Sequence, residues 1–122
     1  MIILSSGHNP KDKGAVKFDD QRFNEYDQAC VWVDLLVEEL MLVGVSSHTV
    51  PTGTLSSKIK YINNLDFPIT LAMEIHFNSA SNVKAVGSET LYCPGSLKGL
   101  AYAAKVQAAL ASVFKPNRGF KE

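Results

Sequence analysis

The chain has 122 residues, of which 46% are apolar, so it is long enough for one small domain with a real core and too apolar to be disordered. Lys plus Arg and Asp plus Glu each number 12, and the resulting zero net charge argues against a nucleic-acid binder, which normally carries a basic excess. The start of the sequence has no basic leader and no long apolar run. It therefore predicts no signal peptide. No apolar segment of the sequence is long enough to cross a bilayer, and we expect either a chain made for the cytoplasm or a piece of a longer protein.

The first half of the chain predicts a strand, a loop and a long helix. Residues 2–5 form a short apolar run typical of a buried strand, and the polar residues 9–18 predict a loop. From Asp20 the spacing becomes helical, with Asp19 or Asp20 as the N-cap and Gly44 at the C′ position. The apolar stripe of this helix consists of Phe23, Tyr26, Cys30, Val33, Val37, Leu40 and Val43.

The second half continues the alternation of strands and helices. It predicts a strand over 45–50, followed by a helix over 54–65 with Leu55, Ile59 and Ile62 on one face. Two strands follow, over 69–76 and 86–92. The last predicted element is a helix over 97–114, which ends at the turn residues 116–119. This order predicts a three-layer α/β fold in a single domain, 1–122, with a mainly parallel, twisted sheet flanked by helices.

Two histidines and a glutamate lie where an α/β fold places its ligands. His8 follows the first strand and a glycine, His76 ends the third strand, and Glu25 opens the long helical pattern. Two imidazoles and one carboxylate suit a catalytic zinc, which takes three protein ligands and leaves a position for water. Ordinary structural roles compete with this interpretation: a histidine bonded within a turn, a half-buried histidine, and an acid that favours a helix N-terminus.

Glu74 is an acid inside an apolar strand, and strand alternation places its side chain on the same face as that of His76. A buried carboxylate needs a partner, so Glu74 is expected either to pair with a cation or to help at the site. By contrast, His48 within a short strand is interpreted as an ordinary surface or edge residue. Cys30 and Cys93 have no short spacing and are predicted to be free thiols.

Several short motifs follow one another along the whole chain. They are Ser6-Gly7-His8-Asn9-Pro10 with Asp12 and Gly14 after the first strand, Asn24-Glu25 at the long helix, Lys58-Ile59 and Ile62-Asn63, Ile75-His76-Phe77-Asn78-Ser79-Ala80 after the third strand, Gly87-Ser88-Glu89-Thr90-Leu91-Tyr92, and Asn117-Arg118-Gly119-Phe120-Lys121 near the end. Each piece is weak by itself, but the ordered set is specific. In this order the chain resembles the zinc-dependent N-acetylmuramoyl-L-alanine amidases of the AmiC and phage-endolysin type.

The resemblance implies a ligand set and a substrate. It assigns the zinc ligands to His8, Glu25 and His76. It also implies cleavage of the amide between N-acetylmuramic acid and the L-alanine of the peptidoglycan stem peptide, on the cell wall and after release from the cell. Asn78 is a candidate substrate-binding residue. Loop carbonyls near Asn9 and Asn78 are the nearest candidates to hold the second ring nitrogen of each metal histidine.

Two departures from the family determine the activity that we expect. Family domains usually continue past the Arg-Gly motif to a strand that bears the general-base glutamate. This sequence stops at Glu122, so the domain is expected to be incomplete at its C-terminus. Glu74 stands where a small serine is common, which makes Glu74 the candidate catalytic residue. We expect zinc binding with poor cleavage unless Glu74 supplies the base. The alternatives are an inactive module that binds cell-wall peptide and another zinc peptidase.

Overall fold

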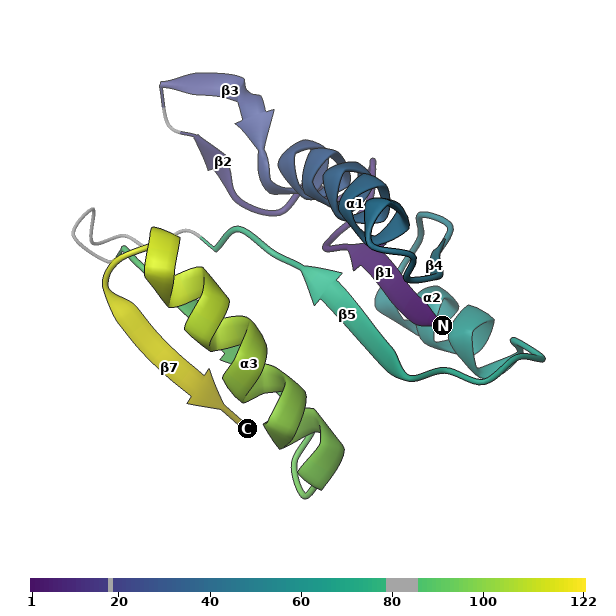
Figure 1. The fold of residues 1–122 in the computed structure, drawn as a ribbon. Helices are drawn as coiled ribbons and strands as arrows, with labels where there is room; N and C mark the ends of the chain where they lie inside the picture. The colour runs from purple at the N-terminus through teal and green to yellow at the C-terminus, as the bar shows by residue number, and fades with distance from the viewer. Residues whose placement is uncertain (18, 79–85) are drawn as a thin grey trace. The chain divides into compact units, whose positions relative to one another are not determined.

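The computed structural model describes residues 1–17, 19–78 and 86–122, which divide into two compact units, Met1–Ser79 and Ala80–Glu122. Every helix and strand predicted from the sequence is present with shifted bounds, and the structure adds three further strands, β2, β3 and β7 (Figure 1). The elements are β1 (Ile2–Ser6), β2 (Val16–Lys17), β3 (Asp20–Asn24), α1 (Glu25–Leu42), β4 (Ser47–Thr49), α2 (Leu55–Asn63), β5 (Leu71–Ile75), β6 (Ser88–Leu91), α3 (Leu97–Val113) and β7 (Asn117–Lys121).

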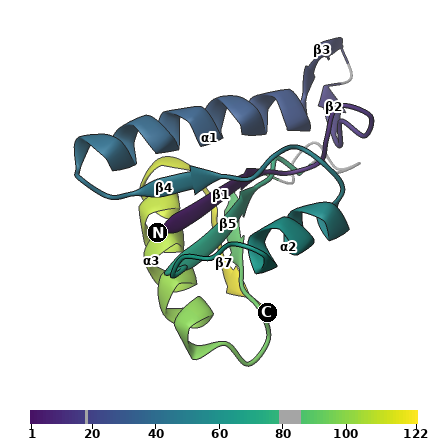
Figure 2. The same cartoon turned by 90° about the vertical axis from the view of Figure 1, so that its right-hand side faces the viewer.

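The unit Met1–Ser79 is built on a parallel sheet in the order β4–β1–β5. In the central strand β1, Ile3 and Leu4 are both 0% exposed although their side chains point to opposite faces, so both faces of the strand are covered. Figures 1 and 2 show α1 on one side of this sheet and α2 on the other. The predicted three-layer α/β arrangement with a parallel sheet is therefore confirmed for this unit.

The long helix begins at Glu25 and not at Asp20, so its predicted start is wrong. Asn24 is its N-cap: the Asn24 backbone is extended, and the side chain accepts a hydrogen bond of 3.0 Å from the N–H of Asp27. Because an extended N-cap cannot continue the helix backwards, the residues before it pair differently. They form β3, within the residues that were predicted to begin the helix, and β3 runs antiparallel to β2, which lies in the predicted loop 9–18.

The buried face of α1 matches the predicted stripe at its centre and departs from it at both ends. Val33 is 6% exposed, whereas Phe23, which lies in β3, is 50% exposed and Val43 is 70% exposed. The end of the helix follows the prediction, since Val43 is the C-cap and Gly44 adopts a positive φ of 72° at C′.

The shorter helix, α2, buries a lysine in place of its predicted apolar face. Leu55 is 64% exposed, Ile59 is 48% exposed and Ile62 is half-buried, whereas Lys58 is 4% exposed. The Lys58 ammonium donates to the Ser6 carbonyl at 2.5 Å and lies 3.0 Å from Glu74 Oε2. These contacts explain the burial, because a buried charge is tolerated when it is paired and hydrogen-bonded.

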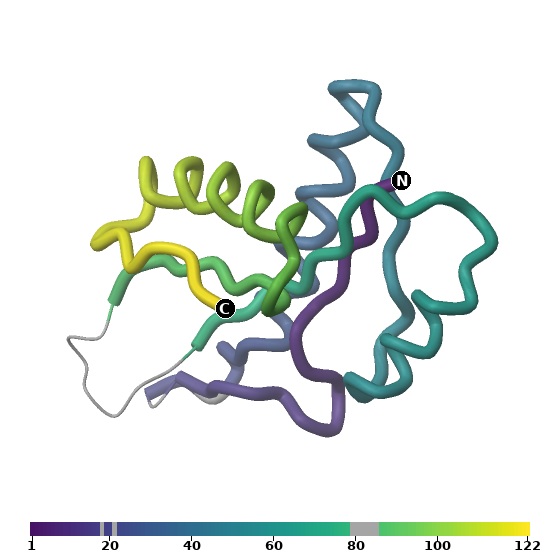
Figure 3. Tube along the Cα trace, turned by 90° about the horizontal axis from the view of Figure 1, so that it is seen from below, coloured from purple at the N-terminus to yellow at the C-terminus, as the bar shows by residue number. Residues whose placement is uncertain are grey.

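The described part of Ala80–Glu122 consists of β6, β7 and α3, and α3 packs on both strands. Figure 3 shows β7, in yellow, running beside β6, with which it pairs in parallel. Gln107 of α3 is 2% exposed, and its side chain bonds Thr90, Ser88 and Asn117. The strand β7 was not predicted, because its short polar sequence lacks the apolar alternation that identifies a strand.

Two simpler predictions concern the thiols and the membrane. Cys30 and Cys93 are free cysteines, as predicted. In residues 1–17, 19–78 and 86–122, no helix is both long enough and apolar enough to cross a membrane.

Candidate metal centre

Three side chains singled out in the sequence meet at one edge of the β4–β1–β5 sheet. His8 follows β1, His76 follows β5, and Glu25 is the first residue of α1. The two histidines come together because parallel strands present their carboxyl ends at the same edge. His8 Nε2 lies 3.1 Å from Glu25 Oε2, and His76 Nδ1 lies 2.8 Å from Glu25 Oε1. One donor atom from each residue falls within 4.8 Å of the others, so the three side chains form a possible ligand set.

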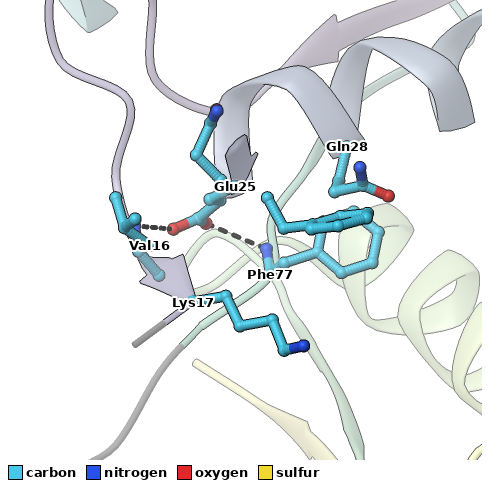
Figure 4. A pocket seen from close by; sticks show the side chains of 8 residues that line it. Val16, Lys17, Glu25, Gln28 and Phe77 are labelled. Carbon is cyan, nitrogen blue, oxygen red and sulfur yellow. Dashed lines mark hydrogen bonds between the residues drawn. The ribbon is translucent and has the colours of Figure 1, made fainter. Parts of the chain in front are cut away.

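Glu25 is the fixed centre of this cluster. It is 4% exposed, and its carboxylate accepts hydrogen bonds from the N–H of Ala15 at 3.0 Å and the N–H of Phe77 at 2.9 Å. Figure 4 shows the second of these bonds reaching from Glu25 to Phe77. Burial raises the pKa of Glu25, but the two N–H groups and the His76 ring outweigh burial, so the pKa lies below its ordinary value. The carboxylate is therefore ionised and held in one orientation.

Two glycines give the cluster the room that it needs. A Cβ atom at Gly7 would lie 2.6 Å from His76 Nδ1, and a Cβ atom at Gly14 would lie 2.5 Å from His8 Nε2 and 2.6 Å from Glu25 Oε2. His8 itself has a positive φ of 59°, which is uncommon for a residue with a side chain. The close packing of the backbone against the three side chains thus restricts which residues this part of the chain accepts.

The outer nitrogen of each histidine faces a carboxylate. His76 Nε2 lies 2.8 Å from Glu74 Oε1, and His8 Nδ1 lies 3.5 Å from Asp12 Oδ2. The sequence left these partners unassigned and offered loop carbonyls near Asn9 and Asn78 only as nearby candidates; in the structure carboxylates face both nitrogens. The loop after β1 returns Asp12 towards His8, and Glu74 lies in β5 two residues before His76, on the same side of the chain.

The charges of Glu74 and His76 stabilise each other. The hydrogen bond to His76, with a further contribution from Lys58, lowers the pKa of Glu74 to about 2 although burial opposes this shift. The Glu74 carboxylate, with a smaller contribution from Glu25, raises the pKa of His76 against the effect of burial. Glu74 thus pairs with a cation, as expected, and it also contacts the cluster. Lys58 belongs to the Lys58-Ile59 motif and a lysine partner for Glu74 was expected, but the burial of Lys58 was not predicted, although a lysine near the predicted apolar face of a helix is a usable signal.

The other residues considered in the sequence lie outside the cluster. Asn78 is exposed beyond the end of β5, and its predicted contact with substrate stays a prediction. His48 lies in the edge strand β4, where Nε2 is 2.8 Å from the hydroxyl of Tyr61 and the ring stacks on that of Tyr61. The edge position of His48 is confirmed.

A pocket of about 230 Å³ lies directly beside Glu25 (Figure 4). The hairpin of β2 and β3, the first turn of α1 and the segment after β5 form its walls. The apolar side chains of Val16, Phe23 and Phe77 give it a mainly apolar surface. The residues that line it are Ala15, Val16, Lys17, Phe23, Asn24, Glu25, Gln28 and Phe77.

Comparison with known proteins gives a family match and several similar folds. The sequence matches the family model described as N-acetylmuramoyl-L-alanine amidase over residues 2–122. A comparison with curated proteins found no match.

Among solved structures, the chain is similar to the CwlD amidase from Clostridioides difficile, which was solved in complex with the GerS lipoprotein. The TM-score is 0.83 and the sequence identity is 22%, and the match covers 98% of this chain and 70% of the CwlD chain. It is also similar to the amidase AmiC2 of Nostoc punctiforme, with a TM-score of 0.80 and 22% identity over 99% of this chain and 68% of that one. The catalytic domain of the amidase CwlV from Bacillus (Paenibacillus) polymyxa var. colistinus gives a TM-score of 0.81 and 22% identity over 98% and 68% of the two chains. At this identity the three structures support the fold.

Proposed function

Because this chain belongs to the N-acetylmuramoyl-L-alanine amidase family, we propose that it hydrolyses the amide between N-acetylmuramic acid and L-alanine in peptidoglycan, with a zinc ion held by His8, Glu25 and His76. The observation that carries the proposal is the convergence of two imidazole nitrogens on one buried carboxylate. This geometry is independent of the family match and agrees with it. The cell wall would then be the place of action.

The donor set fits zinc by its chemistry. Imidazole nitrogens suit zinc and other transition metals, whereas magnesium and calcium prefer oxygen ligands alone. Two nitrogens and one carboxylate also match the three-ligand pattern of a catalytic site with an open position. When bound, zinc would polarise the scissile carbonyl and lower the pKa of a water molecule towards neutrality.

The residues around the donors would prepare the site before any metal arrives. The N–H groups of Ala15 and Phe77 fix the orientation of the Glu25 carboxylate, so the protein supplies this ligand already in place. The pocket beside Glu25 offers an apolar surface next to the reacting groups, where part of the substrate would lie out of water. Asn78, exposed just beyond β5, is the polar residue that we propose to contact the substrate.

Amide cleavage also needs a group that transfers a proton to the departing amine, a step worth roughly 10²–10⁴ in rate. An efficient base has a pKa near the working pH. The pKa of Glu74 is lowered to about 2, and His76, Lys58 and Ser5 engage both of its oxygens. These contacts favour another role for Glu74, although its catalytic role stays a prediction until hydrolysis by Glu74→Gln is measured.

The zinc site is tested by replacing one histidine inside the cluster and one outside it. His8→Ala is expected to lose zinc and hydrolysis, because it removes one of three donors. His48→Ala is the matched control, since His48 bonds Tyr61 and takes no part in the cluster. Zinc content is measured by metal analysis of the purified proteins, and hydrolysis by following muramyl peptides with and without a chelator.

The products separate the proposed reaction from its alternatives. Release of a free lactyl acid and an L-alanine amine, lost on chelation and restored by zinc, supports the amidase. Cleavage at another bond would indicate a different zinc peptidase. Zinc and peptide binding without cleavage would indicate a module that recognises the cell wall. A folded wild-type protein that binds no zinc would contradict the proposed metal site.

A second prediction uses the crowding around the donors. Gly14→Ala is expected to lower zinc affinity, because the new Cβ would lie 2.5 Å from His8 Nε2 and 2.6 Å from Glu25 Oε2. Gly44→Ala is its control: both glycines have a positive φ, but a Cβ at Gly44 meets nothing within 4 Å. Both variants should lose stability from backbone strain. Calorimetric zinc titration checks the difference, and equal affinities in the two folded variants would contradict it.

A further inference from the structure

A line of polar contacts leads from the interior of the Met1–Ser79 unit to the outer side of His76. The side chain of Lys58 is 4% exposed, and its ammonium lies 3.0 Å from Glu74 Oε2. Ser5 Oγ donates to the same oxygen at 3.2 Å. The other oxygen, Oε1, lies 2.8 Å from His76 Nε2. The Glu74 carboxylate is thus held on one side and presents its second oxygen to the histidine.

This arrangement gives the Nε2–H group of His76 a partner that remains available when a metal occupies Nδ1. Ionised carboxylates only accept hydrogen bonds, and both nitrogens of His76 face one: Nε2 faces Glu74 Oε1 and Nδ1 lies 2.8 Å from Glu25 Oε1. Nδ1 belongs to the candidate ligand set, and a metal bound there would take its lone pair, which leaves the proton on Nε2, where Glu74 accepts it. His8 presents its opposite nitrogen, Nε2, to Glu25. Its outer partner is Asp12, 3.5 Å away with a side chain that is 72% exposed, so His8 is held less firmly.

We propose that Glu74 is a positioning residue of the metal centre: it fixes the ring orientation of His76 and accepts its Nε2–H when Nδ1 binds the metal, while Lys58 and Ser5 hold Glu74 in place. The role rests on the proposed zinc site. Glu74 acts through His76 and not on the substrate, which distinguishes this role from that of a general base. Outer carboxylates of this kind typically contribute roughly 10–100-fold to metal affinity.

The test must separate the effect of Glu74 on zinc binding from the destabilisation caused by an unpaired Lys58. Glu74→Ala alone would leave Lys58 buried without its partner, so both residues are changed in two matched double variants. Lys58→Met with Glu74→Gln keeps an oxygen that accepts from His76 Nε2, and Lys58→Met with Glu74→Leu does not. Both lose the same ion pair. We expect the Leu form to bind zinc roughly 10–100-fold more weakly than the Gln form. Glu89→Gln, which alters an ion-paired carboxylate in the other unit, should bind zinc like the wild type.

A second readout reports the histidine directly. Nitrogen NMR of the metal-free protein with a neutral His76 ring should show a larger share of the Nε2–H tautomer in the wild type and the Gln form than in the Leu form. In the Leu form only Glu25, on the Nδ1 side, is left to accept the ring proton. Equal zinc affinity and equal tautomers in the folded Gln and Leu forms would overturn the positioning role. If the wild type bound no zinc but the tautomers differed as expected, the proposed function would fail while the control of His76 by Glu74 would stand.

Discussion

Replacing Glu25 by glutamine is expected to remove zinc binding almost completely, with a loss greater than the roughly 10–100-fold typical of outer contacts. The substitution keeps the shape of the side chain but removes the charge that both histidines face. It also disturbs the local hydrogen bonds. The N–H groups of Ala15 and Phe77 both donate to this carboxylate, and an amide has a single oxygen to accept them. One N–H would then face the amide nitrogen, which costs about 1–3 kcal/mol of folding free energy.

The control for this variant is Glu38→Gln, an exposed carboxylate on the same helix. Its zinc affinity and its thermal melt should equal those of the wild type. Both variants are titrated with zinc by calorimetry at a temperature where circular dichroism shows them folded. If Glu25→Gln bound zinc with the affinity of the wild type, the metal would lie elsewhere and the proposed ligand set would be contradicted.

The second large effect concerns folding. Val33→Asp is expected to destabilise the protein by about 3–5 kcal/mol, because it places an unpaired charge at a position that is 6% exposed. Small domains are typically stable by roughly 5–15 kcal/mol, so this change removes much of the margin. Denaturant unfolding followed by circular dichroism measures the loss.

Val31→Asp is the matched control, since it makes the same chemical change in α1 at a residue that is 52% exposed. Its unfolding free energy should change little. Trp32→Asp should fall between the two, because Trp32 is 37% exposed and its ring lies 6.1 Å from that of Phe77. An equal loss of stability in the Val31 and Val33 variants would mean that the buried face of α1 is assigned incorrectly.

The candidate ligands were predictable from the sequence because local pattern and topology point to them. His8 and His76 each follow an apolar run that predicts a strand, and parallel strands bring such positions to one edge. Glu25 was found through the same pattern together with its motif, although the predicted helix start was wrong. The class of the fold followed from the alternation of strands and helices, which depends on residues close together in the chain.

The exact start of α1 and the strand β7 needed the tertiary structure. Asp19 and Asp20 are acceptable N-caps in isolation, yet Asn24 is the N-cap because the preceding residues pair with β2. Similarly, β7 has no apolar alternation and becomes a strand through its pairing with β6. Both features depend on strand pairing, of β3 with β2 and of β7 with β6. The propensity of the local sequence does not reveal such pairing.

The residues that contact the candidate ligands show most clearly what the sequence predicts and what only the tertiary structure adds. The sequence by itself determined that Glu74 and His76 share a face of one strand, because side chains alternate along β-structure. Only the tertiary structure decided that Lys58 reaches Glu74 across the face of the sheet, which places an ionised carboxylate behind His76. Such a contact links residues far apart in the chain. Its net energy is the attraction between the two charges less the cost of taking the buried Lys58 ammonium out of water. Burial and pairing at that distance are properties of the packed molecule and leave no periodic signal in the sequence.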